Sequence, residues 1–461
     1  MKFGKTLRNV FTVGGLTAFS RVLGLVREML QSRLIGAGVE QSAFTLAFAL
    51  PNMARKLFGE GALTAAFVPV FKGEVAAGEV ESARRLARAV LTLVFLILGA
   101  VVVLTVLGLT VALGLSAADV VSLSPRAVLT LKLVRILFPY MIFICGAAFG
   151  MGVLNALGRF VEGAFMPAFL NVVWIAALGA LCFFPGLSLA ARVTVVCWAI
   201  LAGGAAQMAF LFHCMRKRSY GFRFAPFAAF RDEKFRLVWK NTLIGALGAG
   251  AIQVNYLLDQ VLGQVAAPWA AGVIGYAERL MDLPLGVVGV AFGTVLLPTF
   301  AGHFAKGDAA GARRALKRAI LQMTAVMLPA SLVTFFGAPL IVRLVYEGHA
   351  FDATATVRVA RALSVYGLGL CFFSIQKCLI PFFQAQKDMK TPLRVTVRTV
   401  CLNAALNVLA IVALPPDWRH VGLAASTSFC ALVGCVLLVR ALPRTCHLPP
   451  ECGRIRESQT K

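Results

Sequence analysis

The sequence predicts an all-α integral membrane protein with about twelve transmembrane helices. Composition is the first reason: of 461 residues, 59% are hydrophobic and 14% are charged, and the mean hydropathy is +0.83. A soluble globular domain is about half apolar and a quarter charged. This composition argues against a soluble enzyme, a disordered chain or a disulfide scaffold. The second reason is that the apolar stretches are long and continuous, whereas the strands of membrane barrels alternate over about ten residues.

Twelve apolar segments are long enough to cross a bilayer as helices, which takes roughly 20 residues. The first follows a basic N-terminus without a small-residue cleavage pattern, so we expect it to be retained. After the last segment, residues 442–461 form a polar tail. The expected spans are residues 9–35, 42–70, 89–115, 127–155, 162–184, 190–214, 239–263, 268–300, 319–345, 358–384, 392–414 and 420–441.

The charges of the loops orient these spans. The chain has 45 Lys and Arg against 20 Asp and Glu, a net charge of +25. Loops on the side of the N-terminus hold about 29 of the basic residues and the opposite loops about six, and an excess of this kind marks the cytoplasmic side. We therefore expect both termini in the cytoplasm. Because the loops account for the charge, we expect no nucleic-acid partner.

An internal repeat divides the chain. A shift of 229 residues, which takes Phe71 to Phe300, aligns two stretches around basic loops. An even number of spans separates the copies, so the sequence predicts a parallel repeat of two six-helix lobes, residues 1–214 and 239–441, around a V-shaped central cavity suited to alternating access. Chance similarity of two basic loops is the alternative. Pro69, Gly73, Gly78, Glu79, Ala83, Arg84, Arg85 and Arg88 align with Pro298, Gly302, Gly307, Asp308, Ala312, Arg313, Arg314 and Lys317.

A linker of residues 215–238 connects the lobes. Phenylalanines alternate there with Arg and Lys. Interleaved basic and aromatic residues also occur in nucleic-acid binding proteins, but between two spans they favour an amphipathic segment on anionic lipid headgroups at the cytoplasmic surface.

Ionisable residues inside the spans are the candidate functional residues, because charges in a bilayer usually face a partner or a wet cavity. The helix is weakened locally beside them, by Pro51, Gly59 and Gly61 in the second span and by Pro and Gly residues in the eighth. The candidates are Arg21, Arg27 and Glu28 in the first span, Arg55, Lys56 and Glu60 in the second, Asp259 in the seventh, and Glu278, Arg279 and Asp282 in the eighth.

The arginines among them indicate an anionic substrate. A guanidinium is always charged, and its planar fork suits phosphate, so several arginines in one cavity favour a diphosphate. Structural ion pairs are the alternative, above all for Lys56 with Glu60 and for Glu278 or Asp282. The five histidines lie at span ends, in loops or in the tail. With no nucleophile or metal-ligand motif either, we expect a transporter without a cofactor or structural metal rather than an enzyme.

Three motifs resemble one family. They are SRVLGLVRE at residues 20–28, LPNMARKLFGEGALTAAFVPVF at residues 50–71, and GYAERLMDLPLGVVGVAFGTVLLPTF at residues 275–300. Together they resemble the MurJ (MviN) lipid II flippases of the multidrug/oligosaccharidyl-lipid/polysaccharide exporter superfamily. The similarity runs from Lys5 to about Arg440.

The resemblance implies a flippase of the bacterial cytoplasmic (inner) membrane, which moves the undecaprenyl-diphosphate-linked peptidoglycan precursor to the outer leaflet. It implies headgroup binding by Arg21, Arg27, Glu28, Arg55 and Arg279, with Lys56, Glu60, Glu278 and Asp282 as secondary charges. It also implies a site for a monovalent cation, Na⁺ or H⁺, for which Asp259, Gln384 and Asp388 are the candidates.

The chain departs from the family pattern in three places. Ser42 occupies a position that is acidic in many members, Ala404 stands where a hydroxyl is expected, and members usually have fourteen spans. We expect the lipid tail to pass between the first and eighth helices. Pro284, Gly286 and Gly289 form the expected hinge. We expect a monomer that contacts membrane lipids and the cell-wall synthesis machinery.

Two other functions remain open from the sequence. A drug or polysaccharide exporter of the same superfamily, including one for another lipid-linked oligosaccharide, predicts little dependence on Arg21 and Arg279. A non-transporting scaffold in cell-wall assembly predicts that the basic loops matter and the charges inside the spans do not.

Overall fold

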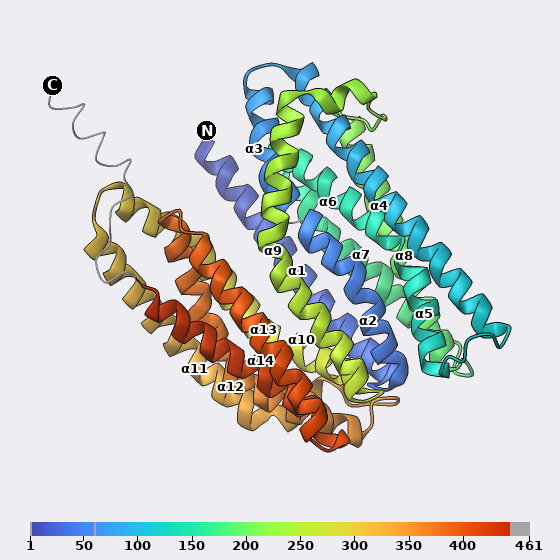
Figure 1. The fold of residues 1–461 in the computed structure, drawn as a ribbon. Helices are drawn as coiled ribbons and strands as arrows, with labels where there is room; N and C mark the ends of the chain where they lie inside the picture. The colour runs from blue at the N-terminus through green and yellow to red at the C-terminus, as the bar shows by residue number, and fades with distance from the viewer. Residues whose placement is uncertain (1, 60, 443–461) are drawn as a thin grey trace, which may run out of the picture. The chain divides into compact units, whose positions relative to one another are not determined.

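The structure is a computed structural model that describes residues 2–59 and 61–442 (Figure 1). Helices make up nearly all of this part of the chain, and an antiparallel bridge joins Gly348 and Phe351. The helices are α1 (Lys2–Ile35), α2 (Val39–Ala54), η1 (Arg55–Gly59), α3 (Ala62–Ala76), α4 (Val80–Ala117), α5 (Pro125–Leu137), α6 (Tyr140–Ala156), α7 (Phe160–Leu181), α8 (Leu189–Arg216), η2 (Phe227–Arg231), α9 (Glu233–Ala266), α10 (Ala270–Ala305), α11 (Ala309–Tyr346), α12 (Ala353–Ala385), α13 (Lys390–Ala413) and α14 (Pro416–Arg440).

Each of the twelve predicted spans is helical. In the part of the chain that the structure describes, eight helical segments are long and apolar enough to cross a membrane: α4, α5 with α6, α7, α8, and α11 to α14. The other predicted spans are α1, α2 with α3, α9 and α10. The all-helical fold class is therefore confirmed, and the chain is a multi-pass membrane protein.

Two predicted spans contain breaks. The second is split by η1, a π-helix over Arg55–Gly59, and α3 begins only at Ala62. The fourth is divided into α5 and α6 at Phe138 and Pro139, because proline lacks the amide hydrogen that would continue the helical ladder.

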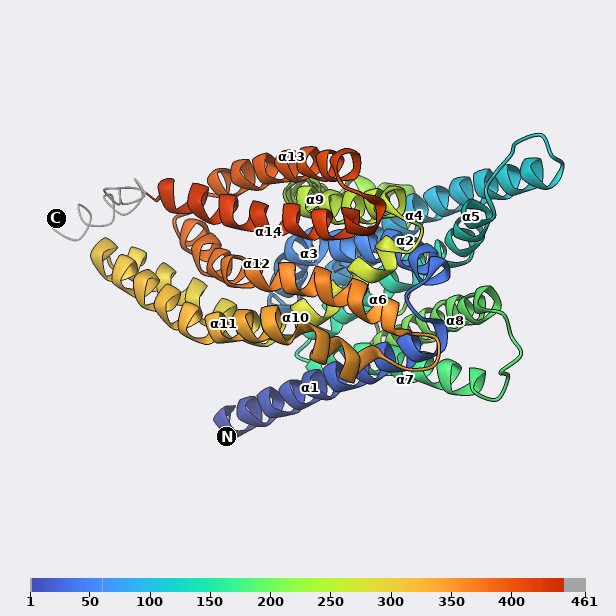
Figure 2. The ribbon, with the colours of Figure 1, turned by 90° about the horizontal axis from the view of Figure 1, so that it is seen from below.

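The chain forms two compact units. Unit 1 consists of residues 1–260 and 346–352, and unit 2 of residues 261–345 and 353–461. The boundary thus falls inside α9, and the loop between α11 and α12 belongs to unit 1. In unit 1, α1 packs along α7, α7 and α6 pack on α8, and α2 packs on α5. In unit 2, α12 packs between α10 and α14, and α13 packs on α14 (Figure 2).

The predicted repeat is visible in the backbone. Helices α3 and α10 end at Ala76 and Ala305, α4 and α11 run over Val80–Ala117 and Ala309–Tyr346, and α6 and α12 end at Ala156 and Ala385, all 229 residues apart. The turns repeat as well: Gly78 and Gly307 have φ of +81° and +73°. The repeated phenylalanines Phe71 and Phe300 are both fully buried. Two copies of one helical unit therefore underlie the fold.

Candidate functional site

Arg27 lies at the contact between α1 and α7. Its Nη1 donates to Asn171 Oδ1 at 2.9 Å, its Nη2 contacts the carboxylate of Glu28, and its guanidinium lies 4.2 Å from the ring centroid of Trp174. The side chains of Arg27 and Glu28 are each 13% exposed. Asn171 Nδ2 also donates to the carbonyl of Ser20 at 3.0 Å, so one amide fixes both the arginine and the helix that carries it.

The surroundings hold this guanidinium in one place. Phe44 and Phe48 of α2 pack edge-on against Trp174, with centroids 5.7 and 5.5 Å away, and the Trp174 ring is buried. Arg27 Nε is buried and has no hydrogen-bond partner among the described residues. An arginine that is positioned on one face and retains a free donor is suited to bind an anion, because charged hydrogen bonds are the strong ones.

Two further arginines of the predicted set lie in unit 1. Arg21 is on the exposed side of α1. Arg55 is the first residue of η1, and its Nε and Nη2 donate to Asn52 Oδ1 at 3.1 and 3.0 Å. Short π-helices occur frequently at functional sites. The sequence predicted a locally weakened helix at this point, and the structure shows that the weakened segment is the π-helix η1.

Lys56 contacts the segment of α9 that also carries Asp259. The ammonium of Lys56 lies 5.1 Å from the ring centroid of Tyr256. Asp259, one turn further along α9, is 7% exposed, and Asn255 Nδ2 donates to its Oδ2 at 3.3 Å. A buried carboxylate of this kind is compatible with a cation ligand. Glu60, the expected partner of Lys56, lies outside the described residues.

The candidates of α10 belong to unit 2. Glu278 is half-buried, and Tyr366 of α12 donates its hydroxyl to Glu278 Oε1 at 3.4 Å. Arg279 and Asp282 are exposed on the same helix. Glu278 is therefore tied to α12, a neighbouring helix of its own unit.

The expected hinge residues lie inside a continuous helix. α10 runs through Pro284, Gly286 and Gly289 without interruption. Lys377 of α12 crosses here: its Nζ donates to the carbonyl of Leu285 at 3.4 Å, and a Cβ on Gly289 would lie 2.8 Å from its Cδ. Gly289 thus gives room for a lysine against the helix.

The remaining candidates are at the turn between α12 and α13. Gln384 is half-buried on the last turn of α12. Asp388 Oδ1 accepts hydrogen bonds from the backbone amides of Lys390 and Thr391, both at 3.0 Å. Burial acts to raise the pKa of Asp388, but the hydrogen bonds from Thr391 and Lys390 outweigh it and leave the pKa below its usual value. Asp388 therefore pairs with two of the free backbone amides at the start of α13.

Reasoning from the sequence did not identify the residues that contact the predicted charged side chains. A charged residue inside an apolar span was the available signal for Lys377, and an amide inside a span was the signal for Asn171. Trp174, Tyr256 and Tyr366 gave no signal, because aromatic residues are ordinary in apolar spans. Among the described residues, no three His, Cys, Asp or Glu side chains lie together as a metal site would require.

Comparison with known sequences identifies the family. The sequence model of the family described as "Lipid II flippase MurJ" matches residues 31–454. A "Probable lipid II flippase MurJ" of Rhizobium tropici is 33% identical over 455 residues, which is 98% of this chain and 84% of the relative. The chain belongs to the MurJ family. A "Lipid II flippase MurJ" of Burkholderia cenocepacia is 30% identical and matches over 97% of this chain and 86% of its own length.

Solved structures agree with this fold. A structure of "Lipid II flippase MurJ, inward closed conformation" has a TM-score of 0.77 at 24% identity and covers 93% of this chain and 87% of its own. An inward-facing multidrug resistance MATE family transporter of the MOP superfamily has a TM-score of 0.74 at 14% identity, covering 97% and 99%. At these identities the likeness concerns the fold, which MurJ proteins and MATE transporters share.

Proposed function

We propose that this chain is a lipid II flippase, a transporter that moves the undecaprenyl-diphosphate-linked peptidoglycan precursor from the inner to the outer leaflet. The observation that carries the proposal is the match to MurJ relatives over nearly the whole chain. The arginine held between α1 and α7 supports it, because a diphosphate needs fixed cationic donors at membrane depth.

Arg27 is the centre of the proposed headgroup site. Asn171 and Trp174 fix its plane, and its Nε has no hydrogen-bond partner among the described residues. Glu28 beside it balances the charge in the absence of substrate. Arg21, Arg55 and Arg279 provide the further positive charges, with Lys56, Glu278 and Asp282 in secondary roles.

The transport cycle is proposed to be alternating access in the cytoplasmic membrane of a bacterium, with both termini in the cytoplasm. The Pro284–Gly289 segment of α10 acts as the hinge. Asp259, with Asn255 beside it, binds the coupling cation, Na⁺ or H⁺, and Gln384 and Asp388 are the weaker candidates for that site. The chain works as a monomer and supplies the cell-wall synthesis machinery.

Complementation tests the proposal. The lipid II flippase of a bacterial host is depleted, and this chain is supplied as wild type, Arg27→Ala, Arg279→Ala or Arg440→Ala. Arg440 is exposed at the end of α14, so Arg440→Ala is the matched control that removes one positive charge outside the proposed site. We expect growth with wild type and Arg440→Ala and none with the other two at equal membrane levels. Growth with all four would contradict headgroup binding by arginine.

Two further experiments distinguish a flippase from a drug exporter and from a scaffold. A drug exporter of the same superfamily would extrude a cationic dye from the host and tolerate Arg27→Ala. A scaffold would tolerate Arg27→Ala and Arg279→Ala together but not the loss of several loop arginines. Dye efflux without rescue of growth would overturn the flippase proposal.

A further inference from the structure

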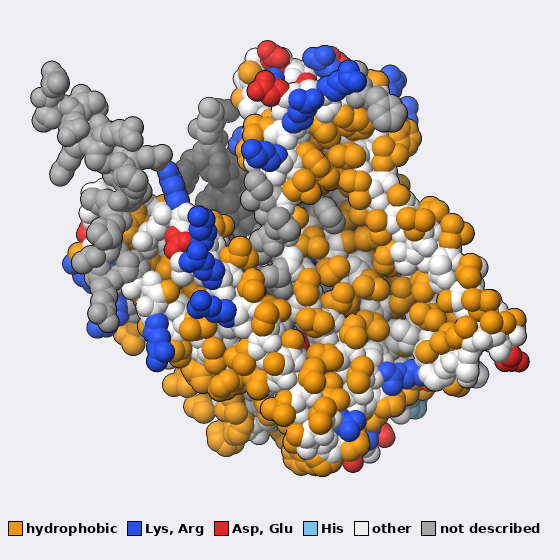
Figure 3. Space-filling view, in the orientation of Figure 1, with side chains coloured by type: hydrophobic (Ala, Val, Ile, Leu, Met, Phe, Trp, Pro, Cys, Tyr) orange, Lys and Arg blue, Asp and Glu red, His pale blue; other side chains and the backbone are white. Residues whose placement is uncertain are grey.

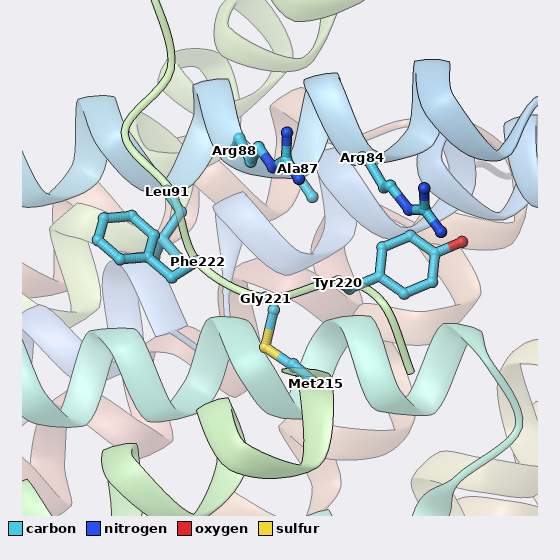
Figure 4. Close-up of a pocket in the computed structure, with 8 residues that line it drawn as sticks. All are labelled: Arg84, Ala87, Arg88, Leu91, Met215, Tyr220, Gly221 and Phe222. Carbon is cyan, nitrogen blue, oxygen red and sulfur yellow. The ribbon is translucent and has the colours of Figure 1, made fainter. Parts of the chain in front are cut away.

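A pocket lies at the basic end of unit 1. It is formed by one face of α4 and by the chain that follows α8 (Figure 4). It is a shallow cleft that opens to the surface of the unit. Its lining residues are Arg84, Ala87, Arg88, Leu91, Met215, Tyr220, Gly221 and Phe222.

The lining is held in place before any ligand arrives. Tyr220 N donates to the carbonyl of Met215 at 3.0 Å, which turns the chain at the end of α8. Phe222 packs against the rings of Phe95 and Phe212, with centroids 5.3 and 5.9 Å away. Further along, Ala225 N donates to Thr92 Oγ1 of α4 at 3.0 Å. The loop is therefore a fixed wall of the pocket.

The positive charge of the pocket is incompletely matched. Arg84 Nη1 pairs with the exposed Glu81 at 3.1 Å, but Arg84 Nε is buried and has no hydrogen-bond partner among the described residues. Arg88 makes no ion pair within the described part of the chain. A buried guanidinium donor without a partner is costly, which points to a ligand that supplies an acceptor.

Tyr220 completes the polar side. The guanidinium of Arg84 lies 5.9 Å from its ring centroid, and Figure 4 shows the two side chains next to each other. Burial raises the pKa of Tyr220, although Arg84 acts in the opposite direction, so the hydroxyl remains a donor at neutral pH. Two arginine forks and a phenol are suited to a phosphate group.

The other side of the pocket is apolar. Leu91, Phe222 and Met215 line it, and Phe222 lies at the end opposite Arg84 in Figure 4. Beyond Leu91, α4 exposes apolar side chains such as Leu96 and Leu104, which are 50% and 71% exposed. Figure 3 shows the same boundary at larger scale: Lys and Arg gather at the end of unit 1 near the turn between α3 and α4, above a broad hydrophobic band. The pocket lies at the border between the two surfaces.

We propose that this pocket binds the phosphate headgroup of an anionic phospholipid in the leaflet on the basic side of the membrane. Arg84 and Arg88 bind the phosphate, and the glycerol and upper acyl carbons lie against Phe222 and Leu91. Free phosphate shares the polar half of this chemistry but not the apolar half. A lipid bound here links α4 to the chain that leaves α8.

Lipid binding to the purified full chain tests the site. Native mass spectrometry measures the affinity for phosphatidylglycerol, for phosphatidylcholine and, in competition, for inorganic phosphate. We expect phosphatidylglycerol to bind, Arg84→Gln/Arg88→Gln to weaken it roughly tenfold or more, and Phe222→Ala to weaken the lipid without affecting phosphate. Arg85→Gln/Arg236→Gln removes two exposed charges from the same end of the unit outside the pocket and serves as the control, with affinity close to wild type.

Each other outcome overturns the proposal. Equal losses in both double variants would mean general attraction to surface charge. Displacement of the lipid by millimolar phosphate, or phosphate binding that depends on Arg84 and Arg88 without any lipid preference, would mean a site for free anions. Thermal unfolding of every variant shows whether it is folded, and Arg84→Lys/Arg88→Lys keeps the charge while removing the forks, with an intermediate loss expected.

Discussion

At the scale of single residues, a charge inside an apolar helix depends on the side chains that position it. Arg27 was predicted from the sequence, because arginine inside a span is rare. Its positioning by Asn171 and Trp174 was not predicted, because these residues lie 144 and 147 positions away and meet it only when α1 packs on α7. The chemistry of the candidate site was thus accessible from sequence, and its geometry was not.

Asn171→Ala is the variant that tests this positioning. It removes a hydrogen bond to a charged donor and one to the carbonyl of Ser20. We expect the free energy of unfolding to fall by about 1–3 kcal/mol, with lipid II transport reduced further than stability alone explains. Thermal unfolding and the complementation assay measure the two effects.

Trp174→Phe is the matched control at the same contact. Trp174 Nε1 is buried without a hydrogen-bond partner among the described residues, so the change removes no hydrogen bond. Phenylalanine keeps an aromatic face for Arg27, and we expect a loss of about 1 kcal/mol or less. If Trp174→Phe abolished transport while Asn171→Ala did not, Asn171 would not be the positioning residue.

At the scale of elements, hydropathy located the helices better than their ends. α11 begins at Ala309, ten residues before the predicted span, because a helix continues into water beyond the apolar stretch that reveals it. The break between α5 and α6 was missed although Pro139 marked it, since a long apolar run masked the local signal. The weak point in the second span was predicted from Pro51, Gly59 and Gly61, but its π-helical form needed the structure.

The loop between α11 and α12 is fixed to the end of α1. Ala350 N donates to the carbonyl of Arg33 at 3.0 Å, and Ser32 Oγ donates to the carbonyl of Tyr346 at 3.1 Å. Gly36, just after α1, has φ of +79°, and a Cβ there would overlap the carbonyl oxygen of Ala350. The contact thus requires glycine at position 36.

Gly36→Ala is expected to separate this loop from α1. The left-handed backbone alone costs about 1–2 kcal/mol for alanine, and the overlap with Ala350 adds to it. Gly78→Ala is the control: its φ is +81°, but a Cβ would have no neighbour within 4 Å, so only the backbone cost applies. Hydrogen exchange at the Ala350 amide should rise in the first variant and not in the second. Equal exchange in both would show that the contact does not depend on Gly36.

An ion pair joins the end of α3 to the start of α9. Lys234 Nζ donates to Glu74 Oε2 at 2.6 Å and to Ser82 Oγ at 3.4 Å. The hydrogen bonds that the Glu74 carboxylate accepts from Lys234 and from Ser82 lower its pKa below the usual value near 4.5. A lowered carboxyl pKa stabilises the fold above the unfolded value, and the contribution disappears as the pH falls through the folded value.

Glu74→Gln should therefore lower the melting temperature by a constant amount from about pH 6 to 9, with the difference shrinking as the pH falls below about 4.5 and through the lowered pKa of Glu74 in the folded protein. Asp232→Asn, a charge loss near the same lysine, should give little change at any of these pH values. A difference between wild type and Glu74→Gln that stayed constant at every pH measured below 4.5 would show that Glu74 acts by packing and not by charge.

At the scale of the whole molecule, the repeat was predicted from nine aligned positions around two basic loops, and the structure extends it to helix ends and turn conformations. Gly158 and Lys387, also 229 residues apart, have φ of +78° and +60° although only one is glycine. Sequence identity between the copies has faded here while the backbone conformation persists. The division into units could not be predicted to the residue, because α9 spans it without a break in the sequence pattern.

The orientation of the whole chain has a direct test. Single cysteines are introduced at Ala77, in the turn before α4, and at Ser122, in the loop before α5, after replacement of the native cysteines. With the basic loops in the cytoplasm, an impermeant maleimide added to intact cells should label Ser122→Cys and not Ala77→Cys. Labelling of Ala77→Cys from outside would reverse the proposed topology.

We propose that the whole chain carries lipid II across the membrane on fixed arginines. The most direct measurement is the fraction of lipid II in the outer leaflet of flippase-depleted cells, read with an impermeant reagent that modifies the exposed headgroup. We predict that wild-type protein restores this fraction and that Arg27→Ala, at equal membrane level, leaves it at the depleted value. Restoration by both proteins would contradict transport by arginine, and restoration by neither would contradict lipid II as the substrate.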